Sequence, residues 1–175
     1  MVDFTYTLDD NERATVIATA EARHKTNRKR GTKDNKIDKK RDPMQVDREG
    51  MAGEVVFGAL ANMFVDLRVD QGAVKADFFA RDGSSIDIKT TRHPNGKLLV
   101  PLHKALDPCD WYGLVICDWP DPETCPTGRL IGGAHRLLAL DRKSVINLGY
   151  GPTYGLDQSA LIPPADFLSL VAGRI

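Results

Sequence analysis

The sequence lacks the features that mark several specialised classes of protein. Its three cysteines are an odd number without tight spacing, which argues against a disulfide framework and favours a reducing compartment. No apolar run approaches the roughly 20 residues that a membrane-spanning helix needs. The N-terminus has neither a basic flank nor an apolar core, so we expect no signal peptide. These absences predict a cytoplasmic protein with no membrane partner.

Aromatic residues are also few, at 7% of the chain, while apolar residues make up 42%. This composition is typical of a globular protein with an ordinary hydrophobic core. The 175 residues match the usual length of one domain. We therefore expect a single domain over residues 1–175, because no internal repeat or interdomain linker is visible.

The formal net charge is zero, but the charges are unevenly distributed. Residues 22–41, which we call the basic segment, hold ten Lys and Arg and two acidic residues, so they carry +8 and the rest of the chain −8. Such a cation cluster is typical of binding to a polyanion, because phosphate neutralisation releases counterions. It favours DNA as the partner, with Arg28, Lys29 and Arg30 contacting the backbone. A solvated loop without a partner is the alternative.

The periodicity of apolar residues predicts both helices and strands. Helical spacing predicts helices over residues 12–28, 46–64 and 165–172. Alternating or continuous apolar patterns predict strands over residues 74–80, 85–91, 97–102, 111–117 and 129–134. Residues 149–155, rich in glycine, are predicted to be a turn-rich loop. The fold class is therefore α/β, with a mixed β-sheet flanked by helices.

Two acids and a lysine stand on the hairpin predicted around Asp82-Gly83. Asp77 lies on the first strand. Asp87 and Lys89 lie on the second, two residues apart and on one face, separated by about 7 Å. Carboxylate oxygens and a backbone carbonyl suit Mg²⁺, and a nearby ammonium can address a metal-bound water. This set therefore indicates metal-dependent hydrolysis of a phosphodiester.

The order of these residues resembles the motif of the PD-(D/E)XK nuclease superfamily. Glu54 on a predicted helix precedes Asp77, and Asp87-Ile88-Lys89 follows on the next strand. The Gly-Glu-aliphatic sequence at residues 53–57 and the buried strand after residue 110 resemble the surroundings of that motif. The resemblance covers residues 50–118, with an alanine at position 76 where the superfamily name has proline.

The resemblance implies a restriction-endonuclease-like core and a role for each site residue. Asp77, Asp87 and the backbone carbonyl of Ile88 would bind Mg²⁺, with Mn²⁺ as a substitute. Glu54 would bind a second metal or a metal-bound water, so whether it is a direct ligand stays open. Lys89 would orient or deprotonate the attacking water, or stabilise the transition state. A chance Asp-x-Lys on a surface hairpin is the alternative, because the tripeptide is short.

These observations predict a metal-dependent deoxyribonuclease that hydrolyses DNA phosphodiester bonds. Arg92, just beyond the Lys89 strand, is a further candidate phosphate ligand. By analogy, the small size favours a phage or mobile-element endonuclease, and a homodimer would allow coordinated cuts in both strands. Two alternatives stay open: a non-catalytic nucleic-acid-binding module on a nuclease-like fold, and a metal-dependent enzyme with another substrate.

Overall fold

The protein is described here from a computed structural model, which covers residues 3–29, 31, 41–69, 76–149 and 151–173. Arg30 and residues 32–40, which form the middle of the basic segment, lie outside the described residues. Residues 74 and 75, the start of the first predicted hairpin strand, also lie outside them.

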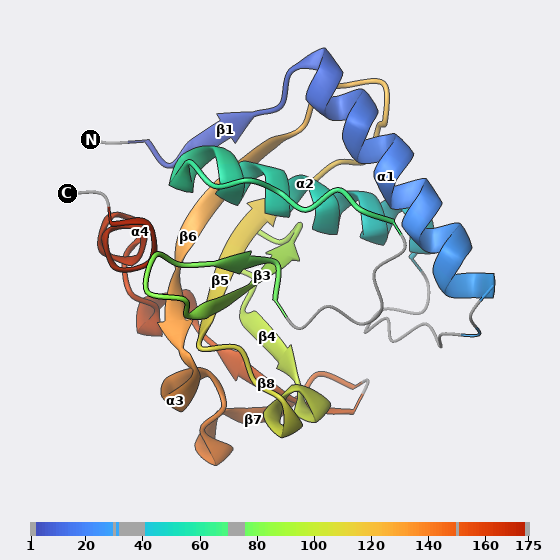
Figure 1. The fold of residues 1–175 in the computed structure, drawn as a ribbon. Helices are drawn as coiled ribbons and strands as arrows, with labels where there is room; N and C mark the ends of the chain where they lie inside the picture. The colour runs from blue at the N-terminus through green and yellow to red at the C-terminus, as the bar shows by residue number, and fades with distance from the viewer. Residues whose placement is uncertain (1–2, 30, 32–40, 70–75, 150, 174–175) are drawn as a thin grey trace.

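Two β-sheets and a layer of helices build the fold (Figure 1). The larger sheet is mixed and five-stranded, because β3 and β5 are parallel and the other neighbours antiparallel. In spatial order its strands are β1 (Thr5–Thr7), β6 (Thr127–His135), β5 (Trp111–Cys117), β3 (Ser85–Thr91) and β2 (Phe78–Phe79). The smaller, antiparallel sheet consists of β4 (Leu98–Pro101), β8 (Pro152–Leu156) and β7 (Val145–Asn147). The predicted α/β class with a mixed sheet is confirmed.

Helix α2 crosses one face of the larger sheet, α4 packs beside it against β6, and α1 packs on α2 (Figure 1). The α-helices are α1 (Asp10–Lys29), α2 (Pro43–Ala61), α3 (Arg136–Ala139) and α4 (Pro164–Ala172). Short 3-10 turns are η1 (Leu102–Leu106), η2 (Arg142–Ser144) and η3 (Gln158–Ala160). Asp9 and Glu12 form a reciprocal capping box at the start of α1, with N–H to carboxylate distances of 2.8 and 2.9 Å. Within the described residues no helix is both long and apolar enough to cross a membrane.

Two predictions of local structure are wrong. The second helix begins and ends three residues earlier than predicted, because Asp42 caps it, Pro43 starts it and Asn62 ends it in a left-handed conformation with φ of 55°. The loop predicted over residues 149–155 contains most of β8, which lies between β4 and β7. This strand depends on pairing with neighbours that are distant in sequence, which local turn residues do not reveal.

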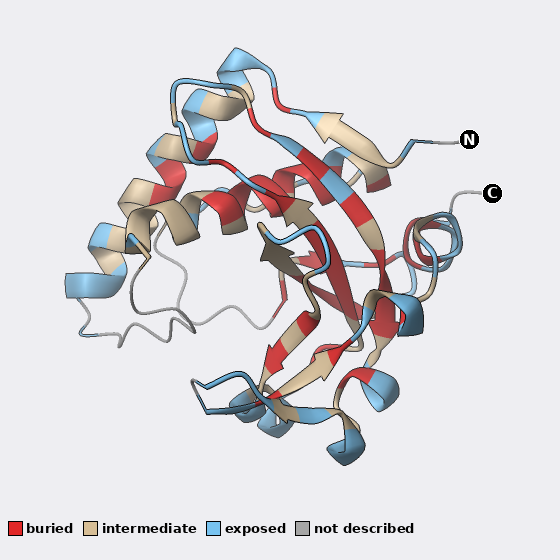
Figure 2. Ribbon diagram, turned by 180° about the vertical axis from the view of Figure 1, so that it is seen from behind, coloured by how far each residue is buried: buried red, intermediate tan, exposed pale blue. Residues whose placement is uncertain are grey.

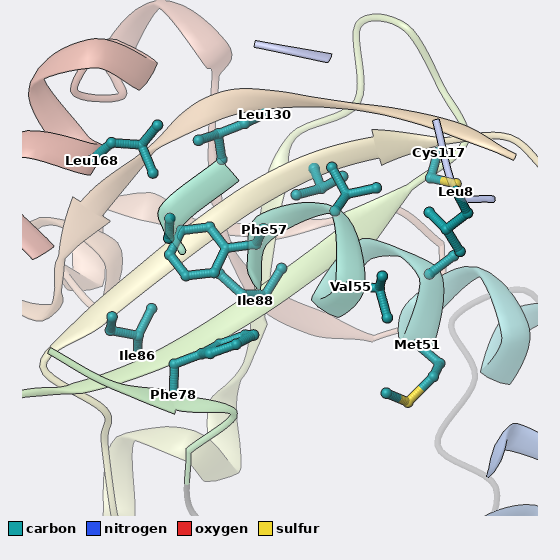
Figure 3. Close-up of a cluster of buried hydrophobic side chains, with 14 of the residues drawn as sticks. Leu8, Met51, Val55, Phe57, Phe78, Ile86, Ile88, Cys117, Leu130 and Leu168 are labelled. Atoms are coloured by element: carbon teal, nitrogen blue, oxygen red, sulfur yellow. The ribbon is translucent and has the colours of Figure 1, made fainter. Parts of the chain in front are cut away.

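Both faces of the larger sheet are covered, so its central strands are buried (Figure 2). On the helix side, Phe57 of α2 packs edge-on against Phe78 at 5.0 Å between ring centroids, beside Ile86 and Ile88 (Figure 3). A second cluster, which includes Tyr112 of β5, fills the space on the other side, toward the smaller sheet. Alternation along β3 therefore directs Asp87 away from the helices and into a covered position.

Candidate active site

The predicted hairpin forms, and it places Asp77 against Asp87. The regular pairing ends with Phe78 opposite Ile86, so Asp77, which was predicted on the first strand, lies just before β2. The N–H of Asp77 donates to the Ile86 carbonyl at 2.9 Å, one residue out of that register, and Asp77 lies close enough to Asp87 for the two charges to interact. The N–H of Ile88 instead donates to Oδ2 of the Asp77 side chain at 2.7 Å. The ladder between β2 and β3 thus ends at Asp77, whose carboxylate takes the N–H that a strand carbonyl would otherwise accept.

Two lysines converge on the carboxylate of Asp87. Lys89 Nζ lies 2.5 Å from Asp87 Oδ1, as their shared strand face predicts. Lys104, from η1, lies 3.2 Å from Oδ2 of the same carboxylate. Asp87 is only 3% exposed, and its Oδ2 accepts no well-directed hydrogen bond. Sequence reasoning missed Lys104, because η1 reaches the site only through the connection between the parallel strands β3 and β5.

Glu54 approaches the acids from the helix side of the sheet. Gly53 permits this approach, since a Cβ atom at that position would lie 2.0 Å from Oγ1 of Thr90 on β3. Glu54 pairs with Arg23 of α1 at 3.6 Å, and its side chain is 19% exposed. Arg23 is a second site residue that the sequence pattern did not reveal.

Burial and neighbouring acids raise the pKa of two of the three carboxyl groups, Glu54 and Asp77. Burial, followed by the charge of Asp77, raises the pKa of Glu54 to about 8, although Arg23 opposes the shift. Burial and the charge of Asp87 raise the pKa of Asp77 to about 6, against the hydrogen bond from Ile88. Burial lowers the pKa of Lys104, but the attraction of Asp87 outweighs it and the net shift is upward. The nearby cations therefore compensate the carboxylates only in part.

The predicted ligands are neighbours, but they do not form a ready-made cage. Among the described residues, no three His, Cys, Asp or Glu side chains are arranged to hold a metal ion together. Both oxygens of Asp87 face ammonium groups. Ile88 directs its N–H toward Asp77, so its carbonyl lies on the same edge of β3. Asp87, Lys89 and Asp77 are thus held by the hairpin, and Glu54 joins them from α2.

Residues 2–124 match a family described as a family of unknown function (DUF5843). This chain belongs to the DUF5843 family. The matched part includes α1, α2 and every strand from β1 to β5, and with them Glu54, Asp77, Asp87, Lys89 and Lys104. No curated protein and no solved structure matches the chain. The DUF5843 match therefore covers the whole candidate site, while β6 and the elements after it lie outside the match.

The basic segment begins beside this site, within the DUF5843 match. Arg28 and Lys29 are exposed in the last turn of α1. Arg28 lies five residues beyond Arg23, or about 7.5 Å along the helix axis. Arg92 is half-buried just after β3, while Arg30 lies outside the described residues. The helix that pairs with Glu54 therefore also carries the exposed start of the basic segment.

Proposed function

We propose that this protein is a metal-dependent deoxyribonuclease with a restriction-endonuclease-like core, acting in the cytoplasm on DNA phosphodiester bonds. The main support is the meeting of Asp77 and Asp87 where β2 leaves β3, with Lys89 on the same strand face as Asp87. Glu54 from α2 adds the helix acid that the PD-(D/E)XK resemblance requires. Burial and neighbouring acids raise the pKa of Glu54 and of Asp77, and such raised pKa values in a cluster of acids are common at functional sites.

The chemistry of these donors fits a divalent cation. Asp87 has a buried oxygen without a well-directed hydrogen bond, and Asp77 and Glu54 are incompletely compensated. Carboxylate oxygens and the Ile88 carbonyl would hold Mg²⁺ or Mn²⁺, with Glu54 binding a second ion or a bound water. A cation there would supply an activated water and neutralise charge on the phosphate.

Basic side chains would orient the attacking water and bind the DNA backbone. Lys89 would orient the attacking water and stabilise the negative charge that develops on the phosphate. Lys104 would bring a second ammonium to the same phosphate. Arg28, Lys29 and Arg92 would bind the backbone on either side, and binding would weaken steeply with salt. A homodimer would supply a second site for coordinated cuts in both strands.

The test is cleavage of supercoiled, linear and branched DNA in Mg²⁺, Mn²⁺ or EDTA. We expect cleavage only with a metal, and a loss of about 100-fold or more in Asp87→Asn and in Lys89→Ala. Lys97→Ala is the matched control, because Lys97 pairs with Asp157 outside the candidate site. Cleavage in EDTA, or full activity in both site variants, would sink the mechanism.

One observation favours a second candidate, a DNA-binding module without catalysis. Lys89 and Lys104 form ion pairs with the two carboxylate oxygens of Asp87. Among the described residues, no group of three His, Cys, Asp or Glu side chains is arranged to bind a metal ion. A module of this kind would bind DNA in the assay but cleave none of the three substrates in any metal. Retention of clustered, mutually repelling acids argues against it, because these acids would also repel phosphate.

A further inference from the structure

A hollow of about 620 Å³ opens directly beside Asp77. The loop that follows α2 forms one wall, with Phe64 and Arg68, and the start of β2 forms the other, with Phe79. Phe64 is fully exposed at 101%, and Phe79 is 64% exposed. Two phenylalanines thus line the hollow that also contains a candidate catalytic carboxylate.

The exposure of Phe79 follows from strand alternation. Phe78 points into the core against Phe57, so Phe79 points to the opposite side of β2. Asp77 lies two residues earlier, just before β2, and lines the same hollow as Phe79. The chain therefore places this aromatic ring and the acid on the wall of one hollow.

The wall that carries Phe64 is tied to the candidate site. Arg23 donates hydrogen bonds to the carbonyl oxygens of Asp66 and Arg68, and the same guanidinium pairs with Glu54. Arg68 is itself held by Asp66 at 2.7 Å. This loop, which carries Phe64, and the helix acid Glu54 thus share one anchoring residue, Arg23.

We infer that this hollow holds an unpaired nucleobase of the DNA strand being cut, stacked against Phe64 and Phe79. Aromatic rings stack on any base, because every base has a π-face, whereas bases inside a duplex already stack on their neighbours. The inference rests on the proposed nuclease function and specifies its substrate: DNA with single-stranded character at the cut, such as a flap, a branch or a free strand.

The experiment measures binding by fluorescence anisotropy in EDTA, so it does not depend on cleavage. The probes are a labelled oligothymidylate and the same strand annealed to oligodeoxyadenylate. Phe64→Ala and Phe79→Ala should each weaken single-strand binding by about fivefold or more, while Phe64→Trp retains it. Duplex binding should change little in any variant. Leu137→Ala is the matched control, since Leu137 is 79% exposed on α3 and does not line the hollow.

Unchanged single-strand binding in both alanine variants would overturn the inference, as would a wild type that does not bind the oligothymidylate. A wild-type dimer that Phe64→Ala dissociates, seen by size-exclusion chromatography, would instead assign the rings to a subunit interface. The two failures are distinguishable. If binding depends on the two rings but no metal supports cleavage, the proposed nuclease function is wrong and the stacking site stands. If cleavage depends on a metal but binding does not depend on the rings, only the stacking site is wrong.

Discussion

Helix α2 carries two acid-glycine pairs, Glu49-Gly50 and Gly53-Glu54, in contrasting surroundings. Glu49 is 3% exposed and is matched on both oxygens: Arg41 Nη2 lies 2.7 Å from Oε2, and Gln45 donates to Oε1 at 2.9 Å. Glu54 has a longer pair with Arg23, at 3.6 Å, and faces two other acids. One acid is fully compensated, and the other is not.

The contrast indicates that Glu49 stabilises the fold, whereas an ionised Glu54 destabilises it. A buried carboxylate with well-directed partners offsets its desolvation, and removing it loses a buried ion pair. A carboxylate among other carboxylates is destabilising when ionised, so its presence needs another explanation. Burial alone does not distinguish the two, whereas the identity of the neighbours does.

The largest effect should come from Glu54→Gln measured by DNA cleavage. We expect cleavage in Mg²⁺ to fall by about 100-fold or more, because the amide cannot replace the negative charge of the carboxylate. Glu49→Gln, tested at a temperature where it stays folded, should retain most of its specific activity. Equal losses of cleavage activity in Glu54→Gln and Glu49→Gln would contradict the distinction between the two acids.

Glu49→Gln should instead have the larger cost in stability. Replacing this carboxylate removes its ion pair with Arg41, whose side chain is only 17% exposed. We expect the free energy of unfolding to fall by about 1.5–3 kcal/mol, measured by urea denaturation. If Glu49→Gln unfolds at the same urea concentration as the wild type, Glu49 is not the structural acid of the helix.

Alanine substitutions at the two glycines, Gly53 and Gly50, should change the stability of the protein in opposite directions. A Cβ at Gly53 would clash with the Thr90 side chain, so Gly53→Ala must displace that side chain or push α2 away from β3, at a cost of about 1–3 kcal/mol. Gly50 has nothing within 4 Å of such a Cβ, so Gly50→Ala should stabilise the helix by about 0.5–1 kcal/mol. Thermal unfolding of both variants tests the difference. A Gly53→Ala protein as stable as Gly50→Ala would show that the helix does not need this close approach.

The sequence predicted the parts of this site that depend on local pattern. The strands at residues 85–91 and 111–117 have the predicted bounds, because alternation, an Asp-Gly turn and a continuous apolar run are local signals. Lys89 beside Asp87 follows from the same alternation. Arg23, Lys104 and β8 were not predicted, since each reaches its partner through tertiary packing of segments distant in sequence.

The smallest predicted effect is a pH-dependent gain in stability of metal-free Glu54→Gln. The folded-state pKa of Glu54 is raised from 4.5 to about 8, so the folded protein binds a proton that the unfolded chain releases. The wild type should therefore lose stability as pH rises from about 4.5 to 8, and the variant should lose less. In EDTA above pH 8 we expect Glu54→Gln to be more stable by on the order of 1 kcal/mol, with no gain near pH 4.

The measurement is the melting temperature as a function of pH for wild type, Glu54→Gln and Glu49→Gln. A gain of this size corresponds to about 2–4 °C for a chain of this length. Glu49→Gln should show no gain at any pH, because its carboxylate is matched by Arg41 and Gln45. Added Mg²⁺ should raise the melting temperature of the wild type at pH 8 more than that of Glu54→Gln. A wild type as stable at pH 8 as the Glu54→Gln variant would mean that Arg23 compensates Glu54 as fully as Arg41 compensates Glu49, and the distinction between the two acids would fail.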